Sequence, residues 1–412
     1  MSHEQPQILF VDNNQLTRES IGQLFQEENW SCFFASSSSD AFDILQNNCV
    51  DLLLATDHIA NNDSLQLISQ VRDLYPDIVR IYFAENKDSI DTVSALAEGL
   101  VQQIIPKPWI ELELMEIVRS ALRQSSLQKK HSPSFQALIN SIPLLPSLPE
   151  SYSNVRSCIV GDEVNIEKMA EYISQDVAIS TALLHWANSA LFGQRFQVDT
   201  IKKAIIVLGT DIVENLILSE SVNRTIAGKL PNIKGFDFSK FKKHSMATAV
   251  LSRLLIKSLL PTDFVEHDRA FIAGLLHDMG KLAAASFFPH RFEKAIELAK
   301  RRSCCLPEAE METYKTHHAE LGSFLAEWWA LPPFTVNAIC WHHQPQSTPV
   351  DQDIIAATHV ANLLSYQFGY GSNGDTCPRE IHEEFCEKFY LSEEASEILK
   401  NETDQTIRAL VR

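Results

Sequence analysis

The sequence predicts two domains of different fold class, an α/β domain followed by an all-α bundle. In the first 123 residues, short apolar segments alternate five times with amphipathic helical segments. Beyond residue 136, apolar residues recur at the three- and four-residue spacing of helices that bury one face. The chain has only 13 glycines among 412 residues, below the usual share of about 7%, which is typical of a helix-rich protein.

Five strands are expected in the first domain, because short runs of apolar residues are separated by polar helical segments. The runs cover residues 8–11, 32–35, 51–56, 79–84 and 103–105. Uninterrupted apolar runs indicate strands that are buried on both faces, so we expect a doubly wound parallel sheet with helices on both sides. The carboxyl ends of parallel strands meet at one edge of the sheet, where we expect a functional site.

Two motifs at that edge resemble the receiver domain of two-component response regulators. They are Val11-Asp12-Asn13 after the first strand and Lys107-Pro108-Trp109 after the fifth. Receivers combine a phosphoacceptor aspartate, a Mg²⁺ held by an acidic pair, a switch Ser or Thr, and a lysine. The resemblance implies a receiver pocket at Asp12, Asn13, Thr56, Asp57, Ala84 and Lys107.

Three of the five functional positions of this pocket are altered. Counting forward from Asp51 and backward from Asp63 both place Thr56 at the acceptor position, and the resemblance puts Ala84 at the switch position and Asn13 at the second acidic position. The sequence therefore predicts a pseudo-receiver that is not phosphorylated and serves as a docking or dimerisation surface. Asp57 is the alternative acceptor, but neighbours on a strand point to opposite faces, so its use would require a register slip or a bulge.

The second domain begins after a polar, Ser-rich stretch that we interpret as a linker. We expect a receiver-like domain at 1–123, a linker at 124–135, the helical domain at 136–370 and a C-terminal helical extension at 371–412 that caps the bundle. Three helices with one apolar face are predicted early in the bundle, the second with Asp176 as its N-cap. Their apolar residues fall within 166–173, 179–186 and 201–208.

Five histidines and an aspartate follow in an order that resembles the HD metal-dependent phosphohydrolases. The pair His277-Asp278 lies between the apolar run 271–276 and Met279-Gly280-Lys281, and the other members are His244, His318, His342 and His343. Imidazole and carboxylate groups suit divalent transition metals, and adjacent histidines suit two neighbouring ions. The resemblance implies a divalent metal, namely Mn, Fe, Zn or Mg, with Lys281 as the catalytic residue if the protein is an enzyme.

One ligand position departs from the HD pattern. HD enzymes carry a final aspartate in a later helix, and the matching segment 359–364 has Asn362 there. A neutral amide oxygen is a weaker ligand than a carboxylate, so we expect weaker metal binding.

Segments on both sides of His244 resemble the HDOD domain, a signalling relative of the HD hydrolases. The resemblance extends over roughly residues 136–370 and implies a regulatory module without catalysis. The matching segments are 145–149, 173–177, 183–190, 204–209, 318–322 and 329–332.

Composition limits the range of partners. A net charge of −18 argues against sequence-independent nucleic-acid binding, which needs clustered Lys and Arg. The chain shows no secretory signal and no apolar span of membrane length, so we expect a cytoplasmic protein without a membrane partner. The expected partners are signalling proteins, such as a kinase or a cyclic-dinucleotide enzyme, and a second copy of the chain as a homodimer.

Two functions remain open from the sequence. The first is a non-catalytic signalling adaptor in which a pseudo-receiver is coupled to an HDOD protein-interaction module. The second is a metal-dependent phosphodiesterase that acts on a cyclic dinucleotide or nucleotide.

Overall fold

The computed structural model describes most of the chain in two compact units, residues 1–146 and 147–412, which are treated separately. The described residues are 5–26, 28, 30–57, 59, 64–85, 95, 99–142, 145–146, 148–160, 163–192, 197–227, 230–371, 374–375 and 381–410. Among the helices of these residues, none combines the length and the apolar character needed to cross a lipid bilayer.

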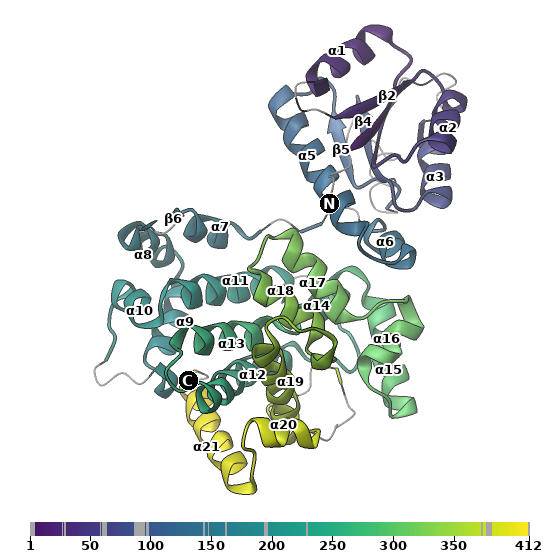
Figure 1. Ribbon diagram of the computed structural model, residues 1–412. Helices are drawn as coiled ribbons and strands as arrows, with labels where there is room; N and C mark the ends of the chain where they lie inside the picture. The colour runs from purple at the N-terminus through teal and green to yellow at the C-terminus, as the bar shows by residue number, and fades with distance from the viewer. Residues whose placement is uncertain are drawn as a thin grey trace. The chain divides into compact units, whose positions relative to one another are not determined.

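The first unit is a parallel sheet with helices on both faces, as the sequence predicts (Figure 1). The five strands have the order β2-β1-β3-β4-β5, and every neighbouring pair is parallel. The strands are β1 (Gln7–Val11), β2 (Ser31–Ala35), β3 (Leu52–Thr56), β4 (Val79–Ala84) and β5 (Gln103–Pro106), and the helices are α1 (Gln15–Gln26), α2 (Ser38–Asn47), α3 (Ser64–Leu74), α5 (Glu111–Gln128) and α6 (Pro133–Ile139).

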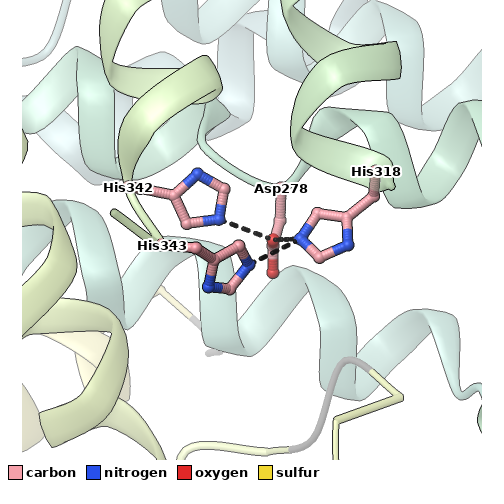
Figure 2. Close-up of side chains that lie close together, drawn as sticks. All are labelled: Asp278, His318, His342 and His343. Carbon is pink, nitrogen blue, oxygen red and sulfur yellow. Dashed lines mark hydrogen bonds and ion pairs between the residues drawn. The ribbon is translucent and has the colours of Figure 1, made fainter. Parts of the chain in front are cut away.

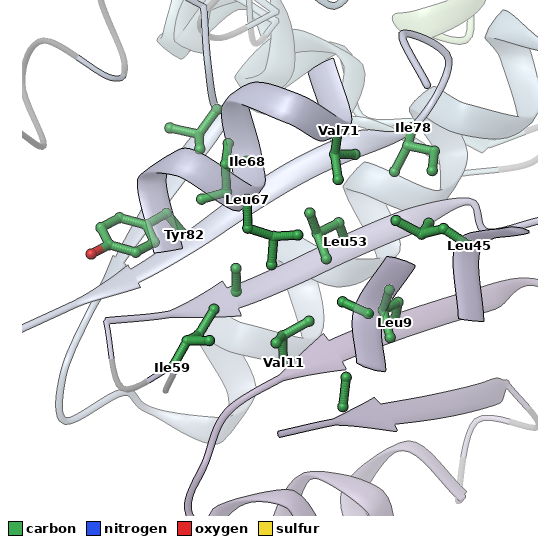
Figure 3. Close-up of a cluster of buried hydrophobic side chains, with 14 of the residues drawn as sticks. Leu9, Val11, Leu45, Leu53, Ile59, Leu67, Ile68, Val71, Ile78 and Tyr82 are labelled. Carbon is green, nitrogen blue, oxygen red and sulfur yellow. The ribbon is translucent and has the colours of Figure 1, made fainter. Parts of the chain in front are cut away.

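Successive residues of β3 serve opposite faces of the sheet. Leu53 and Ala55 pack with side chains of α2 and α3 in one core (Figure 3). Leu52 and Leu54 pack with side chains of α1 and α5 in the other core. This two-sided burial explains why the strand reads as an uninterrupted apolar run.

The segment expected to be a linker, 124–135, is helical over much of its length and belongs to the first unit. Gln124 and Gln128 are buried at the end of α5, and their Nε2 atoms donate to Asn140 Oδ1 at 3.2 and 3.0 Å. Ser125 donates to Asp51 Oδ1 at 3.1 Å. The Ser- and Gln-rich composition that suggests a linker therefore supplies a buried hydrogen-bond network.

That network surrounds a fully buried cation on β4. The Arg80 guanidinium donates four hydrogen bonds to backbone carbonyls, at 2.7 to 3.3 Å. The accepting residues are Ile78, Gly99, Leu100 and Asn140. The Asn140 carbonyl also accepts from Gln102 Nε2 at 2.6 Å. The residues after α5 are thus held to the sheet because the buried charge needs acceptors.

The second unit is almost entirely helical. One short antiparallel pair, β6 (Ile159–Val160) with β7 (Glu163–Val164), adds a small sheet that the periodicity does not predict. Asp176 caps α9, as predicted, with Oδ1 accepting from Ala178 N and Ile179 N at 3.0 and 3.1 Å. The helices preceding the candidate site are α7 (Glu150–Arg156), α8 (Ile166–Ser174), α9 (Val177–Ala187), α10 (Ile201–Leu208) and α11 (Thr210–Ala227).

The later helices form the centre of this unit, where α12 packs against α13 and α19 (Figure 1). The final helix, α21, packs on α12 and α9. These helices are α12 (Phe238–Leu259), α13 (Phe264–Leu276), α14 (Met279–Phe287), α15 (Pro289–Arg302), α16 (Leu306–Tyr314), α17 (His318–Trp328), α18 (Pro333–Trp341), α19 (Gln352–Gln367), α20 (Glu383–Lys388) and α21 (Glu393–Leu410).

Candidate metal centre

The six ligand-type residues singled out in the sequence meet in the interior of the second unit. His244 lies in the middle of α12, and His277 and Asp278 form the junction between α13 and α14. The others come from the start of α17 and the end of α18, where Figure 2 shows His318, His342 and His343 around Asp278. Four separate helical segments therefore supply one cluster.

Two glycines allow these segments to approach. A Cβ atom on Gly280 would lie 1.8 Å from the carbonyl oxygen of His318, and one on Gly322 would lie 2.9 Å from Gly280 N. Only a residue without a side chain fits there. The glycine of the Met279-Gly280-Lys281 motif thus permits the contact between α14 and α17 that brings Asp278 to His318.

The Asp278 carboxylate is the centre of the cluster. Its Oδ2 atom lies 2.8 Å from Lys281 Nζ, 3.2 Å from His277 Nε2 and 3.7 Å from His244 Nε2. Its Oδ1 atom lies 3.2 Å from His318 Nε2 and 3.6 Å from His342 Nε2. His343 Nε2 lies 2.9 Å from His318 Nε2.

These contacts form two ligand groups that share one carboxylate. The first group is His244, His277 and Asp278, and the second is Asp278, His318, His342 and His343; the donor atoms within each lie within 4.8 Å of one another. A carboxylate that offers one oxygen to each group would be able to contribute to both groups if each held an ion.

Hydrogen bonds on the far side of the rings orient the imidazoles. The Nδ1 atoms of His277 and His342 lie 2.8 Å from the carbonyl oxygens of Gly274 and Ile339. A carbonyl only accepts, so Nδ1 carries the hydrogen and Nε2 keeps its lone pair. Among the described residues, neither Nε2 atom has a hydrogen-bond partner. Two buried lone pairs beside a carboxylate fit a divalent metal.

Burial and neighbouring charges shift the pKa values of several groups in the cluster. Burial acts to raise the pKa of Asp278, but the neighbouring His277 and Lys281 outweigh it and hold the pKa well below its usual value. Burial lowers the pKa of His342 to about 3. Burial, followed by the neighbouring His277, also holds the pKa of His244 well below its usual value. Neutral imidazoles and an ionised carboxylate are the protonation states that bind metal.

Glu310 of α16 belongs to the site, although the sequence does not single it out. Its Oε2 atom accepts hydrogen bonds from His318 Nδ1 at 2.7 Å and from His318 N at 2.9 Å, and it is fully buried. Burial acts to lower the pKa of His318, but the charge of Glu310 outweighs it and the pKa is raised. The sequence offered one signal that could have identified Glu310. It shares a face of its helix with Leu306, Ala309 and Tyr314, where an acidic residue is unexpected.

Asn362 lies on α19 beside the first ligand group, and its side chain is buried. One helical turn later, Ser365 Oγ donates to the Asn362 carbonyl at 2.9 Å and lies 2.7 Å from His244 Nδ1. Because the single hydroxyl hydrogen is used, His244 Nδ1 donates to Ser365, and His244 Nε2 faces Asp278. The stretch carrying Asn362 therefore positions His244.

The receiver pocket lies in the first unit at the carboxyl ends of β1, β3, β4 and β5. Asp12 is buried and its Oδ1 accepts from Asn14 N at 2.7 Å, whereas Asn13 is exposed. Ala84 is buried at the end of β4. The switch position therefore offers no hydroxyl.

Asp57, and not Thr56, presents its side chain to Lys107. The Asp57 carboxylate forms an ion pair with Lys107 and accepts from Glu85 N at 2.9 Å, while Thr56 is fully buried. This corrects the expectation that Asp57 would point away from the pocket without a bulge or register slip. β3 ends at Thr56, and Asp57 N still donates to the Phe83 carbonyl at 3.1 Å, so Asp57 lies directly at the carboxyl edge of the sheet.

Comparisons with known proteins agree with this architecture. The sequence profile of the response regulator receiver domain matches residues 8–119, and that of the HDOD domain matches residues 145–345. A solved structure from Shewanella amazonensis, proposed to be a phosphohydrolase, has a TM-score of 0.51 and 21% identity, covering 68% of this chain and 99% of that one. At this identity the likeness shows a shared fold.

Two curated relatives match parts of the chain. An uncharacterized protein of Treponema pallidum is 25% identical over 244 residues, which are 58% of this chain and 46% of that protein. The hydrogenase transcriptional regulatory protein HoxA of Cupriavidus necator is 28% identical over 128 residues, 31% of this chain and 26% of HoxA. The match therefore spans less than half the length of either relative. The chain carries a response regulator receiver domain at residues 8–119, followed by an HDOD domain at residues 145–345.

Proposed function

We propose that this signal-transduction protein is a non-catalytic adaptor whose HDOD domain contains a closed metal centre. The observation that carries the proposal is burial: His244, His277, Asp278, His318 and His342 are all 0% exposed, and the sixth ligand-type residue, His343, is partly buried. Structural metal sites are closed, whereas catalytic sites keep one position open to water or substrate. A closed site stabilises the helices that supply its ligands and leaves the outer surface for binding partners.

The donor set decides which ion the centre would hold. Imidazole nitrogens with one carboxylate suit Zn, Mn or Fe better than Mg, which prefers oxygen ligands. When bound, the ion would supply positive charge to an interior in which Asp278 is balanced by Lys281. The residues would contribute in distinct ways: the imidazole Nε2 atoms and the Asp278 carboxylate would hold the ion, and Glu310 orients His318.

The test measures metal content and hydrolysis on the same purified full-length sample. Elemental analysis is expected to find Zn, Mn or Fe, and assays with added Mn²⁺ are expected to find no cleavage of a cyclic dinucleotide. The His277→Ala, Asp278→Ala double variant should remain folded and lose the metal. His267→Ala is the matched control, since this buried histidine bonds to the Leu260 carbonyl outside the cluster. Turnover that the double variant abolishes would replace the adaptor with an enzyme.

A second candidate function is that of a metal-dependent phosphodiesterase acting on a cyclic dinucleotide or nucleotide. The observation that favours it is the pair of ligand groups sharing Asp278, an arrangement that suits two-metal phosphoester hydrolysis. Lys281 is buried against Asp278, where its ammonium could stabilise charge that develops on a phosphoryl oxygen. The hydrolysis assay above distinguishes the two candidates.

For the receiver domain we propose a docking role without stable phosphorylation. Asn13 is a neutral residue at the second acidic position, which weakens a Mg²⁺ pocket, and Ala84 has no hydroxyl to contact a phosphoryl group. The contact with Lys107 makes Asp57 the acceptor to test. Intact-mass spectrometry after treatment with acetyl phosphate is expected to show no added phosphate. A phosphate increment that disappears in Asp57→Ala would show that the receiver is active.

The partners of an adaptor of this kind are signalling proteins. We propose a kinase or a cyclic-dinucleotide enzyme as the partner class, and a second copy of the chain as a dimer partner through the receiver domain. Size-exclusion chromatography with light scattering tests the dimer, which a mass equal to that of one chain would exclude.

A further inference from the structure

The two oxygens of the Asp278 carboxylate have different neighbours. Oδ2 lies on the side of the first ligand group, where the Lys281 ammonium donates to it at 2.8 Å. Both side chains are fully buried, so the contact lies outside the screening of bulk water. Oδ1 lies on the side of the second ligand group, 3.2 Å from His318 Nε2 and 3.6 Å from His342 Nε2. A full positive charge is therefore already present beside the first group.

The groups behind the imidazoles also differ. In the second ligand group, the Glu310 carboxylate accepts from His318 Nδ1 at 2.7 Å. In the first group, neutral groups lie behind the rings: a backbone carbonyl lies 2.8 Å from His277 Nδ1, and the Ser365 hydroxyl lies 2.7 Å from His244 Nδ1. A carboxylate behind a metal-binding imidazole makes the ring a stronger ligand. The second group therefore offers the better environment for a cation.

The second ligand group also supplies more donors. Figure 2 shows its one carboxylate and three histidines, which together match the number of ligands of a tetrahedral zinc site. Among the described residues, the first group has one carboxylate and two histidines, and the neighbouring Asn362 has a neutral amide. His343 of the second group is partly exposed, so this group has a contact with solvent through which an ion can enter.

We propose that one divalent ion binds tightly in the second ligand group, and that the Lys281 ammonium weakens the binding of a further ion in the first ligand group. This inference rests on the metal centre proposed above. An ion in the first group would use the carboxylate oxygen to which Lys281 already donates. Two cations on one oxygen repel strongly in an interior without water. Lys281 thus makes the two ligand groups unequal.

The experiment titrates the full-length, metal-free protein with Mn²⁺, followed by calorimetry and electron paramagnetic resonance. The wild type is expected to bind one Mn²⁺ tightly, with any second ion about 100-fold weaker or more. Its spectrum should be that of an isolated Mn²⁺ while the tight ion alone is bound. These readouts count ions and do not depend on hydrolysis.

The charge of Lys281 is tested by Lys281→Gln, which keeps a hydrogen-bond donor for Asp278 and removes the ammonium. Binding of the second ion should strengthen about tenfold or more, and the spectrum should become that of two magnetically coupled ions. Lys257→Gln, an exposed lysine on α12, should behave as the wild type. If Lys281→Gln does not melt cooperatively, Lys281→Met takes its place.

His342 and His277 form a matched pair that locates the tight ion. Both are fully buried, both have Nδ1 2.8 Å from a backbone carbonyl, and neither Nε2 atom has a hydrogen-bond partner among the described residues. They differ in their ligand group. His342→Ala should weaken the tight ion about 100-fold or more, whereas His277→Ala should weaken it less than about threefold.

The outcomes separate this inference from the metal centre on which it rests. Two ions of equal affinity in the wild type, or equal losses in His342→Ala and His277→Ala, would overturn the unequal groups and leave the metal centre in place. A folded Lys281 variant that binds its second ion as weakly as the wild type would overturn the role of Lys281. A wild type that binds no Mn²⁺ would overturn the metal centre itself.

Discussion

The two units each bury a charged cluster, and the clusters differ in how well their polar atoms are satisfied. In the first unit, Arg80 donates to four carbonyls, and the amide groups of the surrounding glutamines donate to Asn140; among the described residues of this network, Gln128 Oε1 is a buried atom without a partner. In the second unit, Asp278 is surrounded by imidazoles. The Nε2 atoms of His277 and His342 have no hydrogen-bond partner among the described residues.

This difference separates a structural network from a binding site. A buried polar group whose hydrogen bonds are complete holds its neighbours in place and has no capacity left for a ligand. Buried lone pairs that converge without donors are unfavourable unless something binds them. The first cluster should therefore respond to mutation through stability alone, and the second through metal affinity as well.

The largest expected effect is on the Arg80 network. Arg80→Met removes the guanidinium from four carbonyls, of which only that of Asn140 has a second donor described above, Gln102 Nε2, so the free energy of unfolding of the first unit should fall by about 3–5 kcal/mol. Urea denaturation of the full chain, with hydrogen exchange of peptides from β1 and β3 to assign the transition, measures this. The control is Arg72→Met, since Arg72 forms an exposed pair with Asp73 and should change stability by less than about 0.5 kcal/mol. Equal midpoints for the two variants would contradict the structural role.

Metal addition should affect only the second cluster. At 100 times its dissociation constant, Mn²⁺ or Zn²⁺ should stabilise the second unit by about 2.7 kcal/mol. Asp278→Asn should remove this increment. Asp268→Asn, which alters a carboxylate paired with Arg253 outside the cluster, should retain it. Calorimetric melting with and without the ion gives both values, and an increment that survives in Asp278→Asn would exclude the proposed centre.

Glu310 should act through His318 and not as a ligand. Glu310→Gln removes the charge that orients the ring, so metal affinity should fall about 10- to 100-fold while the ion remains detectable at saturation. Glu312→Gln, an exposed neighbour on the same helix paired with Arg302, provides the control. Unchanged affinity in Glu310→Gln would assign Glu310 to stability only. Competition with a coloured chelator measures the metal dissociation constants of both variants and of the wild type.

The smallest expected effect is an increase in metal affinity. Asn362→Asp introduces the carboxylate of the HD pattern beside the first ligand group, and Mn²⁺ affinity should rise about tenfold because a charged ligand replaces a neutral one. The metal-free protein should become less stable, since an added charge is buried. Asn401→Asp on the exposed face of α21 should do neither. If the affinity of Asn362→Asp stays at the wild-type value, Asn362 does not face the ion.

Periodicity and motifs in the sequence were sufficient for the sheet and for the ligand set. The five strands appear within one residue of their predicted bounds, because an apolar run between polar helices has few other ways to be buried. The order of His244, His277-Asp278, His318 and His342-His343 identified residues from four helical segments that the structure brings together.

Only the tertiary structure decided the contacts that depend on where a strand ends or what a helix packs against. Thr56 and Asp57 are neighbours in sequence, and only the folded edge of the sheet shows that Asp57 is the one that pairs with Lys107. Glu310 looked like one more helical acid until the packing of α16 against α17 placed it on His318. The stretch at 124–135 resembled a linker because its polar side chains bond to Asn140 and Asp51 only in the folded interior, which local composition does not reveal.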